Sequence, residues 1–119
     1  MNQSVIDIPA LRKLSTMIGG QREDLEELIE DFITLIPQQM ESMRSAHAAG
    51  DRAAMRIAVH STKSNARDMG ALELAELCAQ QEQQCKEGDS VDCDAELTTI
   101  FVKADEAIQA FKTINLDDV

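Results

Sequence analysis

The stretch RAAMRIAVHSTKSNARDMGA, residues 52–71, decides the fold because its apolar residues recur at helical spacing. A helix turns by about 100° per residue, so residues three and four apart share a face. Asp51 is placed to cap the start of this helix and Gly70 to end it. The face predicted to pack against a core consists of Met55, Ala58, Val59, Thr62, Ala66 and Met69.

The opposite face of the same helix is basic, with His60 at its centre. No acidic residue stands between Arg52 and Arg67, although the chain has a formal net charge of -11. Solvated helical faces usually carry pairs of opposite charge. A cluster of cations around an exposed imidazole therefore points to a transient anion there, and a plain solvated surface is the alternative. The residues predicted within about 60° of His60 are Arg56, Ile57, Lys63, Ser64 and Arg67.

A phosphoryl group is the anion that this chemistry favours. Imidazole is a nucleophile, and phosphorylation of a ring nitrogen would place about two negative charges beside the cations. Lys63 and Arg67 follow His60 by three and seven residues, so they are on the right face to meet that group. A cation in this position would also stabilise an in-line phosphoryl transfer.

Four further helices are predicted, and no strand. Pro37 falls inside the second of them and is expected to kink or divide it. Asp7 can cap the first helix, and Gly19-Gly20 ends it. The sequence KEGDSVDCD, residues 86–94, is the one obvious loop of any length. The predicted helices cover roughly residues 8–18, 22–48, 72–86 and 94–112.

Packing of these helices gives the expected architecture. Long amphipathic helices with short connections form antiparallel neighbours. We therefore expect an all-α fold: an up-and-down antiparallel four-helix bundle, with the short first helix packed across one end. Aromatic residues make up only 3% of the chain, so the core must come from Leu, Ile, Met and Ala with three Phe. Met17, Met40 and Met43 are expected to fill that core.

Composition narrows the class of protein. A length of 119 residues fits one domain, residues 1–119. With 22 acidic and 11 basic side chains, the surface repels phosphate backbones and anionic lipid, so neither nucleic acid nor membrane is an expected partner. The N-terminus shows no signal peptide and no apolar run reaches about 20 residues, which predicts a cytoplasmic protein. The three cysteines lack metal-ligand spacing and are expected to be reduced, and no metal site is predicted.

The segment AVHSTKSNARDMGA, residues 58–71, resembles the signature of histidine phosphotransfer (HPt) domains, A-x-H-x-L-K-G-S-x-x-x-x-G-A. The resemblance extends over roughly residues 8–111, through a short helix, a Gly-Gly break, a long helix with an internal Pro and an A-G-D turn. Two positions depart from the signature. Thr62 replaces Leu on the core face, and Ser64 replaces the Gly at which a partner's backbone comes close. The matching positions are Ala58, His60, Lys63, Gly70 and Ala71.

The resemblance implies a role for each part of this face. His60 would accept a phosphoryl group from the aspartyl phosphate of a receiver domain and pass it to the Asp of another receiver. Lys63 would be the family's lysine beside the phosphoryl group. The partners would be receiver domains of response regulators and hybrid sensor kinases, and the chain would act as a monomer. The residues expected to dock the receiver are Arg56, Ile57, Ser64 and Arg67.

The same resemblance implies that the catalytic machinery belongs to the partner. The receiver would supply Mg²⁺, and this chain would need no cofactor. The sequence has no glycine-rich ATP lid, so we expect a phosphoryl carrier and not a kinase. The next helix of such domains often places a Gln or similar polar residue near the imidazole, and Glu82 is the candidate by spacing, with Lys86 one turn on. A surface i,i+4 pair between Glu82 and Lys86 is the alternative.

Two other functions stay open at the level of sequence. A helical interaction module could dock a receiver or sensor kinase without carrying phosphate, although the intact pair of His60 and Lys63 argues against it. A metal-binding helical bundle would require inward-facing carboxylates with His partners, which the predicted inner faces almost entirely lack.

Overall fold

The computed structural model describes residues 5–86 and 94–119. In these residues it contains helices and no strand. The order is α1 (Ile8–Met17), α2 (Arg22–Ala49), α3 (Arg52–Asp68), α4 (Leu72–Lys86) and α5 (Asp94–Thr113), followed by a short 3₁₀ turn, η1 (Leu116–Asp118).

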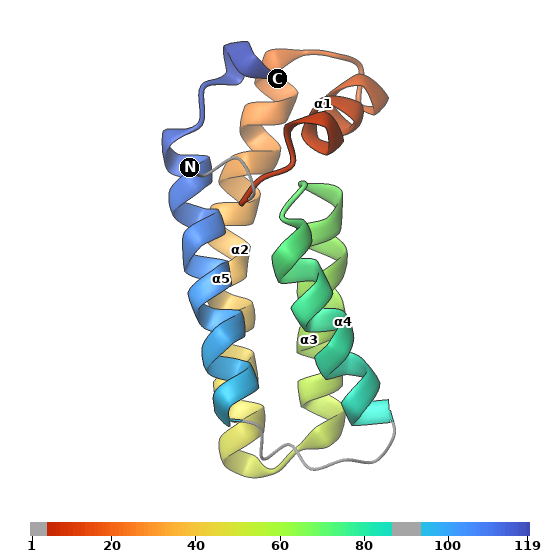
Figure 1. The fold of residues 1–119 in the computed structure, drawn as a ribbon, viewed down its shortest axis with the longest axis vertical. Helices are drawn as coiled ribbons and strands as arrows, with labels where there is room; N and C mark the ends of the chain where they lie inside the picture. Colours follow the sequence, from red (N-terminus) through yellow and green to blue (C-terminus); the bar gives the residue numbers. More distant parts are fainter. Residues whose placement is uncertain (1–4, 87–93) are drawn as a thin grey trace.

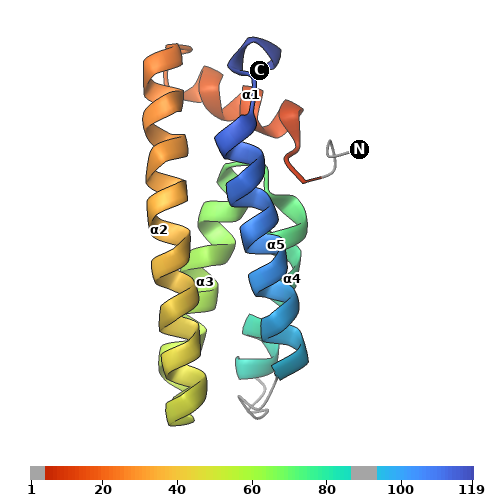
Figure 2. The ribbon, with the colours of Figure 1, turned by 90° about the vertical axis from the view of Figure 1, so that its left-hand side faces the viewer.

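Helices α2 to α5 run alternately up and down and form a bundle (Figure 1). The molecule measures 43 × 28 × 21 Å. Helix α1 lies across one end of the bundle, as the view turned by 90° shows (Figure 2). The predicted fold class is confirmed, and the helix ends lie within about two residues of the predicted ones. The turn η1 was not predicted, and most of the predicted loop over residues 86–94 lies outside the described residues.

The core consists mainly of aliphatic side chains, as the composition predicts. Every residue of the predicted core face of α3 is buried, and Met55, Val59 and Thr62 have no exposed surface. The rings of Phe32 on α2 and Phe111 on α5 pack edge to face, with centroids 5.0 Å apart. Since α3 buries one complete face, its opposite face must be presented to solvent.

Helix α1 is held to the bundle through the turn between α3 and α4. The backbone N–H of Asp7 donates a hydrogen bond to the carbonyl oxygen of Gly70, at 2.7 Å. Leu11, on α1 itself, is completely buried. Asp7 occupies the N-cap position of α1 but its side chain makes no capping hydrogen bond, so that prediction is wrong in its mechanism. At the start of α3, the side chain of Asp51 accepts from the Ala54 N–H at 3.0 Å, as predicted.

Two other predictions need correction. Helix α2 continues without a break through Pro37, which is exposed, so the proline does not divide it, and the alternative of a kink stays a prediction. Met17 is 73% exposed and does not fill the core, whereas Met40 and Met43 do. The reason is the position of α1 across the bundle end, which buries only one narrow side of that helix.

Among the described residues, every helix is too short or too polar to cross a bilayer.

Candidate functional site

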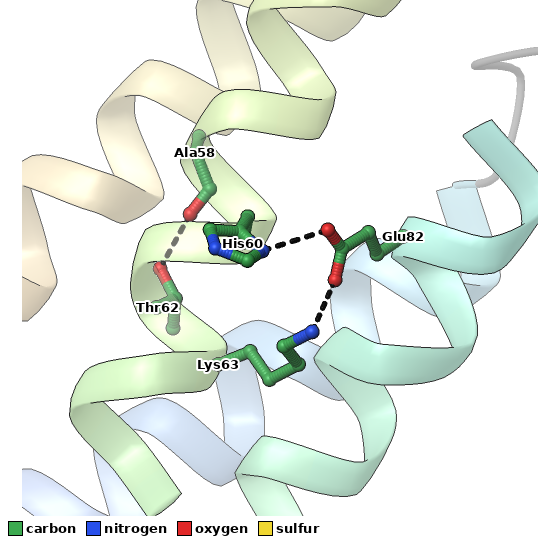
Figure 3. A network of polar contacts seen from close by, with 5 residues as sticks. All are labelled: Ala58, His60, Thr62, Lys63 and Glu82. Carbon is green, nitrogen blue, oxygen red and sulfur yellow. Dashed lines mark hydrogen bonds and ion pairs between the residues drawn. The ribbon is translucent and has the colours of Figure 1, made fainter. Parts of the chain in front are cut away.

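His60 lies on the solvent face of α3, opposite the buried stripe. Its side chain is 59% exposed, which confirms the orientation predicted from helical spacing. The ring is nevertheless fixed on one side, because its Nδ1 lies 2.7 Å from Oε2 of Glu82 on the neighbouring helix α4 (Figure 3). The imidazole is therefore exposed and oriented at the same time.

Glu82 connects the two helices. Its side chain is only 7% exposed, and each carboxylate oxygen has a partner on α3. Oε2 contacts His60, and Oε1 accepts a hydrogen bond from Nζ of Lys63 at 2.5 Å. Burial by itself would raise the pKa of Glu82, but the hydrogen bonds and charges of Lys63 and His60 outweigh it, and the pKa is lowered. Glu82 is therefore a carboxylate at neutral pH.

The ionised state of Glu82 assigns the hydrogen-bond roles of the imidazole. A carboxylate can only accept hydrogen bonds, so Nδ1 of His60 must be the donor. In a neutral imidazole the proton on Nδ1 leaves the lone pair on Nε2. Together with the exposure of the ring, this makes Nε2 the nitrogen available as a nucleophile.

The structure corrects the view of the basic face at one important position. The sequence indicated that no anion neutralises the cations around His60, yet Lys63 is paired with Glu82 and its side chain is only 18% exposed. Residues 52–67 contain no acidic side chain of their own. The neutralising carboxylate comes from α4, 19 residues further along the chain, and only the packing of α3 against α4 brings it there.

The placement of Glu82 beside the imidazole is confirmed, and the alternative of a surface pair with Lys86 is wrong. Both oxygens of Glu82 bind α3 residues instead. Lys86 is the last residue of α4 and is exposed. Among the described residues, the polar cluster consists of His60, Lys63 and Glu82 (Figure 3). Lys86, itself a described residue, forms no ion pair with the cluster.

A surface hollow opens beside His60 along α3. Arg56 and Ser64, predicted as docking residues, line it, and so does Ile57, which is 71% exposed. Arg67 is exposed in the last turn of α3 and does not line the hollow. Three further lining residues, Ala53, Ser61 and Asn65, were missed. Ala53, Ile57, Ser61 and Asn65 follow one another at intervals of four residues and therefore share one face of the helix. This spacing is the signal in the sequence that could have identified them.

Polar bonds along α3 hold this face in position. The Ser61 hydroxyl accepts from Nε2 of Gln39 on α2, at 3.2 Å, and Nδ2 of Asn65 donates to the Ser61 carbonyl oxygen at 3.0 Å. On the buried side, Thr62 donates its hydroxyl hydrogen to the Ala58 carbonyl oxygen at 2.9 Å (Figure 3). Thr62 thereby satisfies its polar atom in the core, so this departure from the HPt signature concerns packing.

The described residues offer no cluster of three or more His, Cys, Asp or Glu side chains that could hold a metal ion. Cys78 lies on α4 near Lys63 and Glu82, and burial raises the pKa of its thiol to about 12. Burial also raises the pKa of Cys85. Neither thiol is therefore a thiolate at neutral pH, the form in which a cysteine acts as a nucleophile.

The lowered pKa of Glu82 predicts how stability depends on pH. A carboxyl with a folded-state pKa below its unfolded value of 4.5 stabilises the fold above that value. This contribution is lost as the pH falls through the folded-state pKa. We expect Glu82→Gln to be less stable than wild type at neutral pH, and the difference to shrink below pH 4.5. Urea unfolding of both proteins across the acid range measures it, and a constant difference would contradict the assignment.

Comparisons with known proteins found a matching family model and similar solved structures. The model of the Hpt domain family matches residues 27–114. The fold resembles histidine-containing phosphotransfer protein B (HptB) from Pseudomonas aeruginosa PAO1, with a TM-score of 0.82 and 24% identity over 91% of each chain. It also resembles the HPT domain of an Hpt sensor hybrid histidine kinase from Shewanella, with a TM-score of 0.75 and 18% identity over 95% of this chain and 98% of that one. A search of curated proteins gave no significant match.

The matched segment includes α3, α4 and all three residues of the polar cluster. It extends over well more than half of the chain, which establishes the family. Hpt domains carry phosphoryl groups and interact with receiver domains. The chain therefore belongs to the Hpt domain family and is a histidine phosphotransfer protein of a phosphorelay.

Proposed function

We propose that His60 is the phosphoacceptor of this protein and that the reacting atom is Nε2. The observation that carries the proposal is the polar cluster of Figure 3: an exposed imidazole whose Nδ1 donates to a buried carboxylate. This arrangement holds the ring in place and directs its lone pair to solvent. A nucleophile fixed in this way reaches an incoming phosphoryl group without reorganising the surrounding side chains.

The transfer step follows from this arrangement. Nε2 attacks the phosphorus of an aspartyl phosphate on a receiver domain, and the bond between phosphorus and the Asp oxygen breaks. The electron pair of that bond leaves with the carboxylate of the receiver. The proton on Nδ1 stays where it is, held by Glu82. The reverse step, with the Asp of another receiver as the attacking group, passes the phosphoryl group on.

The receiver domain is proposed to dock over the hollow beside His60. Ile57 offers an exposed apolar contact there, and Arg56 offers a cation that Glu82 does not neutralise. Ser64 is small enough for a partner backbone to approach, and Arg67 extends the same basic face toward the end of α3. The receiver would bring the Mg²⁺ that the reaction needs, so the chain would act without a cofactor of its own.

A phosphotransfer assay tests this function. A receiver carrying labelled aspartyl phosphate is mixed with the protein, and the transferred label is checked for the acid lability and base stability of phosphohistidine. Two-dimensional ¹H–¹⁵N NMR of the imidazole then identifies the phosphorylated nitrogen. We expect the label on Nε2 of His60. Binding to a receiver without any transfer of label would support the interaction module instead.

Lys63→Ala tests the second residue of the cluster. Lys63 stabilises charge but is not the nucleophile, so we expect label on His60 to form more slowly and not to disappear. The substitution also leaves the buried Glu82 carboxylate without one of its two partners, which should cost about 1–3 kcal/mol of unfolding free energy. Transfer kinetics and urea unfolding measure the two effects.

The matched control is Lys112→Ala, at an exposed position on α5 far from the cluster. It should change the unfolding free energy by less than about 0.5 kcal/mol and leave transfer unaltered. Complete loss of label in Lys63→Ala would show that this residue is as essential as His60 and would contradict the division of roles.

A further inference from the structure

We infer that Glu82 keeps the proton on Nδ1 of His60 after phosphorylation, and that it thereby makes the phosphohistidine short-lived and quick to transfer. This inference rests on the proposed function, since it concerns the phosphorylated form of His60. Glu82 acts through the imidazole and is a positioning residue. Its effect is on the leaving group, because the phosphoryl group bound to Nε2 is on the far side of the ring.

The hydrogen-bond geometry leaves Nδ1 only one favourable state. Oε2 of Glu82 lies 2.7 Å from Nδ1, and Oε1 is occupied by Lys63. A carboxylate has no hydrogen to donate, so it cannot satisfy an unprotonated Nδ1. A glutamine at the same place could rotate its amide and donate to an unprotonated ring nitrogen or accept from a protonated one. The side chain present here therefore favours retention of the proton.

Retention of the proton determines how the phosphoryl group leaves. With a proton on Nδ1 and phosphorus on Nε2, the ring is a phosphoimidazolium. When the N–P bond breaks, its electron pair returns to Nε2, and the ring departs as neutral imidazole with the proton still on Nδ1. Without that proton the ring would depart as an imidazolate anion, a far poorer leaving group. This difference is why acid destroys phosphohistidine and base preserves it.

Glu82 is the charged group placed to control this proton. On α3, Lys63 bonds the other Glu82 oxygen, and Arg56 lines the hollow beside the ring. On α4, Cys78 stays neutral, because burial raises its pKa to about 12. Among the described residues, the atom that meets Nδ1 is an oxygen of the buried Glu82, and this burial limits the screening of the contact by solvent.

The experiment compares the rate of phosphate loss from three phosphorylated proteins: wild type, Glu82→Gln and Glu76→Gln. Glu76 is exposed on the same helix, so its substitution removes the same charge without touching the imidazole. Each protein is labelled by a phosphorylated receiver, separated from it and followed between about pH 5.5 and 8.5, on either side of the ordinary histidine pKa.

We expect all three proteins to lose phosphate at similar rates near the acid end, where solvent protonates every ring. Near the alkaline end, wild type and Glu76→Gln should lose phosphate about tenfold faster than Glu82→Gln, the factor that corresponds to one unit of proton affinity. NMR of the phosphorylated wild type should still show the Nδ1 proton there. This spectrum tests the inference even if Glu82→Gln folds poorly.

Two outcomes overturn the inference and can be told apart. If His60 is labelled but the three pH profiles superimpose, or the Nδ1 proton is missing from the alkaline spectrum, Glu82 does not control the proton. If none of the proteins acquires label on His60, the proposed function itself fails and the inference fails with it.

Discussion

His60→Gln is expected to accept no phosphoryl group from any receiver, while its fold and melting temperature remain close to those of wild type. An amide nitrogen is not a nucleophile, so no phosphohistidine can form. His60 contributes little to the core, because its side chain is 59% exposed. The Gln amide can still donate to the Glu82 carboxylate, so the unfolding free energy should change by no more than about 1 kcal/mol. The phosphotransfer assay and thermal unfolding measure both effects.

His47→Gln is the matched control, because His47 is the only other histidine of the chain. It lies near the end of α2, away from the polar cluster, and should retain the label of wild type. Label that persists in His60→Gln and disappears in His47→Gln would refute the assignment of the phosphoacceptor. A large loss of helicity in His60→Gln would mean that the side chain is part of the core.

Gly70→Ala should cost more stability than the same substitution at the other described glycines, because only a Cβ at Gly70 would meet neighbouring atoms. Gly70 has a φ of +84°, which an L-residue with a Cβ adopts at a cost of about 1–2 kcal/mol. A Cβ there would also lie 2.8 Å from the carbonyl oxygen of Asp7, so the backbone of α1 would have to move. That movement weakens the hydrogen bond from the Asp7 N–H to Gly70, which adds about 1 kcal/mol. The total loss in urea unfolding should be about 2–3 kcal/mol.

Gly50→Ala separates the two causes. Gly50 ends α2 with a φ of +66°, but nothing lies within 4 Å of a Cβ built on it. Its substitution should therefore cost only the backbone strain, about 1–2 kcal/mol. If the two variants lose the same stability, the contact between Asp7 and Gly70 does not anchor α1. Both variants should still be phosphorylated, since His60 lies in the middle of α3 and that contact is at the end of the bundle.

The sequence was sufficient for the helices and for the face on which His60 lies. The apolar residues of α3 recur every three or four positions, and a helix has to bury such a stripe, so the opposite side of the helix is exposed. All the predicted core residues of α3 are buried, and His60 is exposed. The sequence also predicted the helix cap at the start of α3, where the side chain of Asp51 contacts nearby backbone.

The sequence was not sufficient for contacts between elements. It indicated Glu82 only by spacing and left open a surface pair with Lys86, and it gave Lys63 as a cation without a counterion. In the structure Glu82 is buried and binds both His60 and Lys63. The Gly70 turn is similar: its sequence predicted the end of a helix but not the backbone of Asp7 against it.

The sequence alone, through helical periodicity, determined which residues of α3 are buried and that His60 is exposed. The tertiary structure decided the hydrogen-bond state of its imidazole. The reason is physical: the period of a helix is a property of consecutive residues, whereas the partner of Nδ1 is 22 positions away and reaches it only because α3 and α4 pack side by side.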